Sequence, residues 1–229
     1  MDRQIAVVIV AAGRGTRLGR PVPKQFIPLD GSPALRRSVE AFLQRPDIAH
    51  VLPVIGQDDD ALCADALGDV TDPRLLPPVT GGATRAASVR RGLERLAPLG
   101  PSHVLIHDAA RPFVSQAVIA RVIDGLRTCD GVCAAMPVVD ALWRGPDGHA
   151  DTPIPRDGIW RAQTPQGFRF TAILDAHKAH DGLGADDVAV AREAGLPVRF
   201  VEGSEQNYKI TTEADLERAL TDLRGARTD

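Results

Sequence analysis

The run Ile5-Ala6-Val7-Val8-Ile9-Val10-Ala11 leads directly into Ala12-Gly13-Arg14-Gly15-Thr16-Arg17-Leu18-Gly19. Seven consecutive apolar residues are typical of a strand that is buried on both faces, as in a parallel sheet. The glycines that follow allow backbone N–H groups to approach an anion closely. The stretch therefore predicts a buried first strand and a ligand-binding loop at its carboxyl end, where open α/β sheets bind ligands.

Apolar runs and helical periods alternate along the rest of the chain. This alternation predicts βαβ units and an α/β fold with a mostly parallel sheet flanked by helices, in a single domain over residues 1–229. The Thr212 and Asp215 pair resembles a capping box before the last helix. Further strands are expected at Val51–Ile55, Val104–His107 and Val132–Pro137, with a short apolar stretch at Leu75–Val79, and helices around Leu35–Leu43, near Asp59–Leu67, after Thr84, after Ser115 and after Thr212.

Residues 138–160 break this alternation. The segment has no helical period and is rich in proline and glycine. A long excursion from a compact domain is usually functional or an oligomer contact. We therefore expect an irregular arm or β-excursion from the sheet. The proline and glycine residues are Pro146, Gly148, Pro153, Pro155 and Gly158.

Composition excludes several classes of protein. The chain has 229 residues with a net charge of −3, which argues against bulk nucleic-acid binding because such domains are usually basic. Its longest apolar run is too short to span a membrane. The cysteines Cys63, Cys129 and Cys133 lack metal-ligand spacing and indicate free thiols in a reducing compartment. We expect a cytoplasmic protein without nucleic-acid or membrane partners.

The first loop fits neither of two familiar phosphate-binding patterns. Leu18 stands where the third glycine of G-x-G-x-x-G belongs, and G-x₄-G-K-[ST] is absent. The remaining features are a glycine loop and two cations, Arg17 and Lys24, which would attract a triphosphate. A solvated turn with ordinary surface charges is the alternative.

Two further segments carry candidate site residues. Gly81 and Gly82 precede a helix N-terminus, which suits an anion or a polar ligand, although a tight turn with a cap is equally consistent. Asp108 follows a buried strand and precedes Arg111, a pattern that suits hydrated Mg²⁺ and an anionic substrate, or a structural ion pair. His107 is expected to be packed or hydrogen-bonded.

Other elements are more often structural than functional when each is taken singly. His177 and His180 share a helix face, but no third ligand is evident, so we expect surface residues there. The remaining candidate elements are segments 156–166 and 207–211 and the pair Asp186-Asp187.

In this order and spacing, these elements resemble the 2-C-methyl-D-erythritol 4-phosphate cytidylyltransferase family, from Ile5 to about Leu220. The resemblance implies a Rossmann-like domain whose β-arm clasps a second subunit in a homodimer. It also implies a Mg²⁺-dependent (or other divalent-cation-dependent) transfer of CMP from CTP to methylerythritol 4-phosphate, with release of pyrophosphate.

The same resemblance implies roles for individual residues. Arg17 and Lys24 would stabilise the α-phosphate in catalysis, and Arg156 and Lys209 would position the acceptor phosphate. Asp108 would contact substrate hydroxyls and lie near Mg²⁺, with Arg111 on the acceptor side. The nucleotide would be held by Ala11, Ala12, Gly13, Gly15, Gly82, Ser88 and Asp108.

Two departures from the family pattern concern specificity. Ala83 stands where an acidic residue commonly lies near the base, and the arm reads Asp140-Ala141-Leu142-Trp143 where Asp-Thr-Leu-Lys is common, although Arg144 is adjacent. The acceptor could therefore be another polyol phosphate such as ribitol 5-phosphate. A non-catalytic nucleotide-binding module is the remaining alternative.

Overall fold

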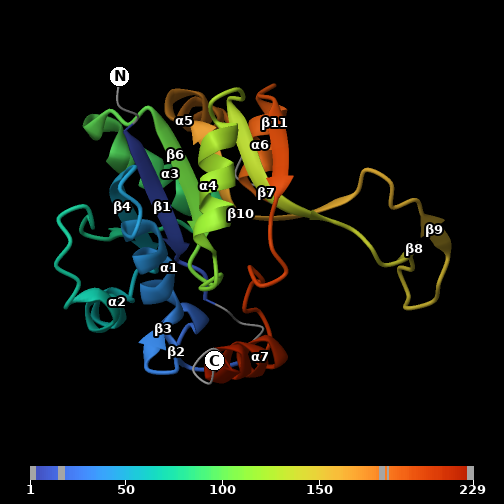
Figure 1. Cartoon of the computed structure of the whole chain (residues 1–229), viewed down its shortest axis with the longest axis horizontal. Coiled ribbons are helices and arrows are strands. Elements are labelled where there is room, and N and C mark those ends of the chain that lie inside the picture. The colour runs from blue at the N-terminus through green and yellow to red at the C-terminus, as the bar shows by residue number, and fades with distance from the viewer. Residues whose placement is uncertain (1–3, 15–18, 181–183, 185, 226–229) are drawn as a thin grey trace.

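A seven-stranded sheet forms the centre of the protein in the computed structural model, which describes residues 4–14, 19–180, 184 and 186–225 (Figure 1). β1 lies between β6 and β4 and is parallel to both. The predicted α/β fold is confirmed, and β10 is the antiparallel exception between β6 and β7. In spatial order the strands are β11 (Val198–Glu202), β7 (Gly131–Pro137), β10 (Trp160–Arg169), β6 (His103–Asp108), β1 (Ile5–Ala11), β4 (Ile48–Ile55) and β5 (Val79–Thr80).

Helices cover both faces of this sheet. Alternate residues of β1 point to opposite sides, and because both sets are apolar, each face is buried under helices. Ile5, Val7 and Ile9 pack with the helices of one face, whereas Ala6 and Val8 pack with those of the other. The first face holds α1 (Ala34–Leu43), α2 (Asp60–Leu67) and α4 (Gln116–Gly125), and the second holds α3 (Arg85–Leu96), α5 (Phe170–Ala179) and α6 (Asp187–Glu193).

The predicted helix starts have the expected caps. The Thr84 hydroxyl accepts a hydrogen bond from the Ala87 N–H at 3.1 Å, and Ser115 accepts one from Val118 at 3.3 Å. Thr212 and Asp215 bond reciprocally, each side chain accepting from the other's N–H, at 3.3 and 2.8 Å. The capping box therefore opens α7 (Glu213–Gly225) as predicted.

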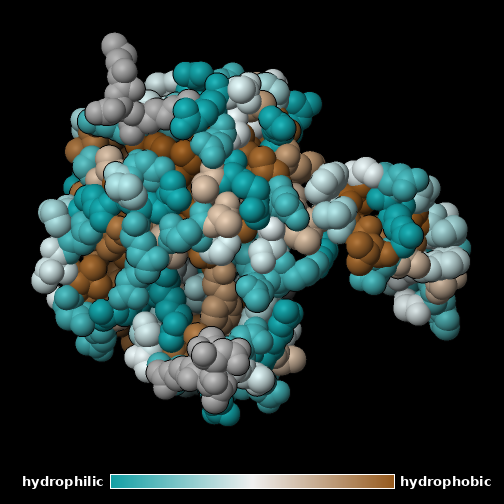
Figure 2. Space-filling view, viewed as in Figure 1, coloured by the Kyte–Doolittle hydropathy of each residue, from teal (hydrophilic) through white to brown (hydrophobic). Residues whose placement is uncertain are grey.

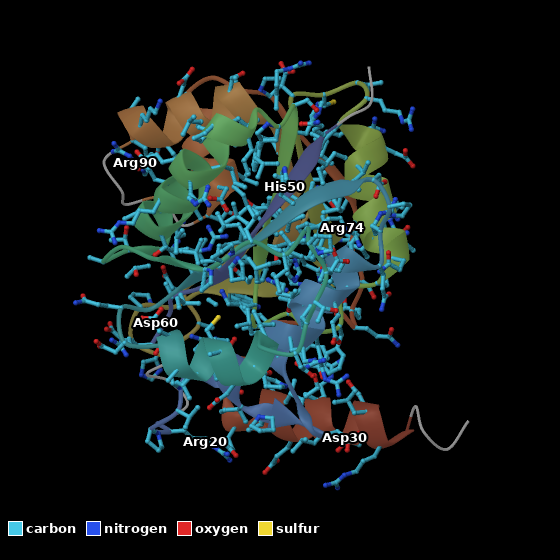
Figure 3. All side chains as sticks on the ribbon, turned by 90° about the vertical axis from the view of Figure 1, so that its left-hand side faces the viewer. Arg20, Asp30, His50, Asp60, Arg74 and Arg90 are labelled. Atoms are coloured by element: carbon cyan, nitrogen blue, oxygen red, sulfur yellow. The ribbon has the colours of Figure 1, made fainter. Side chains whose placement is uncertain are left out.

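A third apolar cluster lies at one end of the molecule, between α7 and the body of the protein. Leu216 and Ala219 pack there against Leu29 and Ile210. Arg20 forms an ion pair with Glu213, and Figure 3 shows Arg20 beside this helix. The sequence analysis assigned no structure to the small elements here, which are η2 (Lys24–Phe26), β2 (Pro28–Leu29) and β3 (Ser32–Pro33).

The arm leaves the sheet where the sequence analysis placed it. The chain departs after Pro137 at the end of β7 and returns at Trp160, which pairs with Pro137. Between them, β8 (Leu142–Arg144) and β9 (Thr152–Ile154) form a small antiparallel hairpin away from the body. Figure 2 shows the arm as a separate lobe bearing apolar patches, and Val139 and Trp143 are 67% and 55% exposed.

The cysteines behave as the sequence analysis expected. All three are free, with Cys63 and Cys133 buried. Burial raises the pKa of the Cys63 thiol to about 11 and that of Cys133 to about 12, so both stay protonated near neutral pH. In the described part of the chain, no helix is long and apolar enough to cross a membrane.

Gly92 allows α3 to lie close to the sheet, which leads to a stability prediction. A Cβ at this position would lie 2.9 Å from Val8 Cγ1 and 3.0 Å from Val54 Cγ2. We expect Gly92→Val to lower the free energy of unfolding, measured in urea, by about 2 kcal/mol through overpacking. Arg90→Val is the control, since Arg90 lies on the exposed side of α3 (Figure 3). Equal losses in the two variants would contradict the packing argument.

Candidate functional site

A cavity of about 720 Å³ opens at the carboxyl ends of the parallel strands. From β1 the chain continues to β4 on one side of it, and after β5 it crosses back to β6 on the other side. The cavity lies at this topological switch point, the place where α/β sheets bind ligands. Its walls are the loops after β1, β4 and β5 and the end of β6. From the predicted site residues it collects Ala11, Ala12, Gly13, Lys24, Gly82, Ser88, Asp108 and Lys209.

The loop after β1 is tied to the neighbouring 3₁₀ helix by Gln25. This side chain is buried, and its amide donates hydrogen bonds to the carbonyls of Ala11 at 2.5 Å and Gly13 at 3.1 Å. Because Gln25 is adjacent to Lys24, these bonds also fix the backbone that carries Lys24 to the cavity wall. Two predicted residues of this loop, Gly15 and Arg17, lie outside the described residues.

The loop after β5 packs directly against the first loop. A Cβ on Gly81 would come within 2.5 Å of the Ala12 Cβ, so glycine is required for this contact. The Ser88 hydroxyl accepts a hydrogen bond from the Gly82 N–H at 3.0 Å and donates one to the Thr84 carbonyl at 2.9 Å. Ser88 therefore fixes the shape of the loop at the cavity wall.

Asp108 forms the centre of a cluster of charges at the end of β6. One carboxylate oxygen lies 2.8 Å from Lys209 Nζ and the other 3.2 Å from Arg85 Nε, with Arg111 Nε at 4.0 Å. Burial alone would raise the pKa of Asp108, but Arg85, Lys209 and Arg111 hold it well below the ordinary value. Asp108 is thus an ionised group that belongs to an ion-pair cluster and also lines the cavity.

Two predicted site residues do not line the cavity. Arg111 stands behind Asp108 and donates a hydrogen bond from Nη1 to the Asn207 carbonyl at 2.7 Å. Arg156 lies on the arm and donates to the Val139 carbonyl, apart from the cavity of its own chain.

Several residues that line the cavity were missed by the sequence analysis. Arg85 follows the capping Thr84 at the start of α3, three residues after Gly82, and this position is the signal that could have revealed it. Arg91, further along the same helix, donates to the Gly81 carbonyl at 2.6 Å. Arg14 joins the cavity wall from the first loop and pairs with Asp58 at 2.9 Å.

The prediction that His177 and His180 are surface residues is wrong. Their side chains are only 1% and 4% exposed, because α6 packs against the helix that carries them. His177 Nε2 lies 3.1 Å from a carboxylate oxygen of Asp187, and His180 Nε2 lies 3.0 Å from Glu193. A local helical period cannot reveal that a second helix covers the face.

His107 is a packed, hydrogen-bonded residue, as expected. Its ring nitrogens lie 3.1 Å from Thr164 Oγ1 and from the Arg111 carbonyl, and its ring packs edge-on against Phe42. The described residues include no group of three or more His, Cys, Asp or Glu side chains placed to hold a metal ion.

Comparison with known proteins points to one family. The profile of 2-C-methyl-D-erythritol 4-phosphate cytidylyltransferase, IspD, matches residues 5–224. Over 214 residues the chain is 51% identical to the enzyme of that name from Cereibacter sphaeroides (strain ATCC 17029 / ATH 2.4.9), covering 93% of this chain and 94% of the relative. It is also 49% identical to the bifunctional enzyme IspD/IspF of Rhodospirillum rubrum, covering 97% of this chain and 58% of that protein.

Solved structures agree with this result. A 2-C-methyl-D-erythritol 4-phosphate cytidylyltransferase from Thermus thermophilus is 32% identical, with a TM-score of 0.76 over 96% of this chain and 99% of that one. A 4-diphosphocytidyl-2C-methyl-D-erythritol synthase from Anaerococcus prevotii is 28% identical, with a TM-score of 0.84 over 98% and 100% of the two chains.

The burial of His107 predicts a pH dependence of stability. Burial lowers its pKa from 6.5 to about 4. Between these values the unfolded chain binds a proton that the folded chain does not, so the free energy of unfolding falls as the pH drops through this window, by at most about 3 kcal/mol. Urea unfolding of the wild type and His107→Gln between pH 7 and 4 should show a shallower fall in the variant. Parallel curves would contradict the assignment.

Proposed function

We propose that this chain, which belongs to the 2-C-methyl-D-erythritol 4-phosphate cytidylyltransferase family, transfers CMP from CTP to 2-C-methyl-D-erythritol 4-phosphate. The products are 4-diphosphocytidyl-2-C-methyl-D-erythritol and pyrophosphate, and the reaction serves isoprenoid precursor biosynthesis. We assign the activity to one nucleotidyltransferase domain spanning residues 1–229. The free thiols are consistent with action in the cytoplasm.

The charge of the cavity wall is the observation that carries this proposal. Asp108 is the only acidic side chain among the described lining residues. The cationic ones come from four separate segments, so their convergence is a property of the fold. Such a wall suits a ligand with several phosphates, because the cations offset the repulsion between two anionic substrates. These cations are Arg14, Lys24, Arg85, Arg91 and Lys209.

The chemistry needs charge neutralisation more than proton transfer. The acceptor is a phosphate monoester with a second pKa near 6, so its attacking oxygen is already anionic near neutral pH. That oxygen forms a bond to the α-phosphorus of CTP, and the bond between this phosphorus and the pyrophosphate oxygen breaks. No general base is required. In keeping with this, no His or Glu side chain is among the described lining residues.

Roles for the described site residues follow from their positions on the cavity wall, and the role of Arg17 follows from the family resemblance. We assign Lys24 and Arg17 to stabilising the charge that develops on the α-phosphate. Backbone around Ala11–Gly13 and Gly82, with the loop that Ser88 shapes, holds the nucleotide. We also assign Gly15, two residues after Gly13 in the sequence, to nucleotide binding.

A divalent cation such as Mg²⁺ fits this donor set. Mg²⁺ is usually bound through one or two carboxylates plus substrate phosphates, and Asp108 is the one carboxylate on the described wall. Asp108, directly or through water, and the triphosphate would hold the ion. When bound, it would neutralise phosphate charge.

The acceptor side lies near Asp108 and Lys209 in this proposal, with Arg111 supporting Asp108 from behind. Arg156 could join this site only from a second copy of the chain, because it lies on the arm. We therefore propose a homodimer in which the arm clasps its partner. The exposed Val139 and Trp143 on the arm support this assembly, since burying them would remove apolar surface from water.

Pyrophosphate release tests the activity. Purified protein with Mg²⁺ and CTP should release pyrophosphate when 2-C-methyl-D-erythritol 4-phosphate is added, and far less with ribitol 5-phosphate. Release with ribitol 5-phosphate alone would keep the chemistry and replace the acceptor. No release with either compound would leave a nucleotide-binding module.

Removing the Lys24 ammonium should lower kcat about 10²-fold, as expected for the loss of one preorganised charge donor. Lys24→Arg should recover only part of the rate, because the two cations differ in shape and reach. Steady-state kinetics at saturating substrates measures both effects for Lys24→Ala and Lys24→Arg. Lys178→Ala is the control, since Lys178 is an exposed lysine on α5. A near-normal kcat in Lys24→Ala would remove Lys24 from the mechanism.

A further inference from the structure

Asp187 is a fully buried carboxylate outside the cavity. It begins α6, and its exposed fraction is 0%. One oxygen lies 3.1 Å from His177 Nε2 and the other 2.8 Å from Arg85 Nη1. An ionised carboxylate only accepts hydrogen bonds, so His177 must donate to it from Nε2.

Arg85 connects this buried carboxylate to the site. Its guanidinium reaches Asp187 with Nη1 and Asp108 with Nε, at 2.8 and 3.2 Å. Within the described residues, the remaining nitrogen, Nη2, is buried with no hydrogen-bond partner. The contact between Nη1 and Asp187 Oδ2 is an ion pair that lacks hydrogen-bond geometry. Carboxylates on two different elements thus determine where the guanidinium lies.

Asp108 makes hydrogen bonds to two of its three cationic neighbours, one through each carboxylate oxygen, while Arg111 lies farther away at 4.0 Å. Arg85 contacts Oδ1 and Lys209 contacts Oδ2. The contacts form a chain of five side chains that starts on α5, away from the cavity, and ends at a cavity-lining ammonium. In order these are His177, Asp187, Arg85, Asp108 and Lys209.

A buried ion pair of this kind adds little net stability compared with an apolar replacement, because desolvation offsets the attraction. Its effect on geometry is the larger one. With Asp187 in place, the Nη1 nitrogen of Arg85 pairs with Asp187, and only Nε contacts Asp108. Without that charge, Arg85 would be free to form a bidentate pair with Asp108, the geometry that Arg–carboxylate pairs prefer. Lys209 would then share its partner oxygen, Oδ2, with the guanidinium, and its ammonium would be held less firmly in place.

We propose that His177 and Asp187 are positioning residues of the transferase site, which hold Arg85 so that Asp108 keeps one oxygen for Lys209. The ammonium of Lys209 is thereby fixed where the acceptor phosphate binds. This inference rests on the proposed function. It assigns to α5 and α6 a part in acceptor binding, although neither residue lines the cavity.

The test compares the KM values of the two substrates in Asp187→Asn. This change removes the charge, keeps the size and leaves an oxygen that can accept from His177. We expect the KM for the acceptor to rise roughly tenfold, because a small displacement of a substrate-binding group produces changes of this order. The KM for CTP should change less than about twofold. Asp187→Glu, which restores the carboxylate, should recover most of the acceptor affinity.

Asp130→Asn is the matched control, because Asp130 also pairs with an arginine, Arg169, but on the surface and outside the cavity lining. It should leave both KM values unchanged. If Asp187→Asn does not fold, His177→Leu removes the outer hydrogen bond alone and should raise the acceptor KM about threefold. Thermal melting of each variant separates loss of folded protein from a change in KM.

An unchanged acceptor KM in a folded Asp187→Asn variant, or equal rises in both KM values, would overturn the positioning role while the wild type remains active. A wild type that releases no pyrophosphate would instead overturn the proposed function and this inference together.

Discussion

The charge of Asp108 is sustained inside the protein by cations that the fold brings together from distant parts of the chain. Arg85 comes from the start of α3, Arg111 from the turn after β6 and Lys209 from the segment before α7. A buried carboxylate without such partners would be protonated. The end of β6, the entry to α3 and the approach to α7 must therefore hold their relative positions for the site to exist.

The glycine loops depend on the same arrangement. β1, β4 and β6 end at one edge of the sheet, so the loops that follow them meet around one cavity. Gln25 ties the first loop to the 3₁₀ helix that carries Lys24, and Ser88 shapes the second. The positive charge of the cavity wall is thus a product of backbone geometry and of hydrogen bonds and ion pairs that hold the cationic side chains in place. Few of these side chains are free to move independently.

Sequence patterns predicted the parallel part of the fold well, because buried strands and capped helices are local signals. The first strand, the Thr84 and Ser115 caps and the arm boundaries were all found in this way. The patterns did not predict the antiparallel β10, whose pairing is set by distant partners, or the burial of His177. Of the predicted site residues that the structure describes, those on the first loop and at strand ends gather at the cavity. Arg156 was placed by resemblance, and its position depends on how the arm is used.

The contact between the two glycine loops has a consequence for sequence variation. A side chain at position 81 would collide with the Ala12 Cβ, which lies within 2.5 Å of where its own Cβ would stand. A side chain at position 81 would require the Ala12 side chain to give way or the two loops to move apart, and moving them apart would widen the cavity that both loops line. Replacements at position 81 are therefore constrained by the residue at position 12 and also by Ser88, whose Oγ would lie 2.7 Å from the added Cβ.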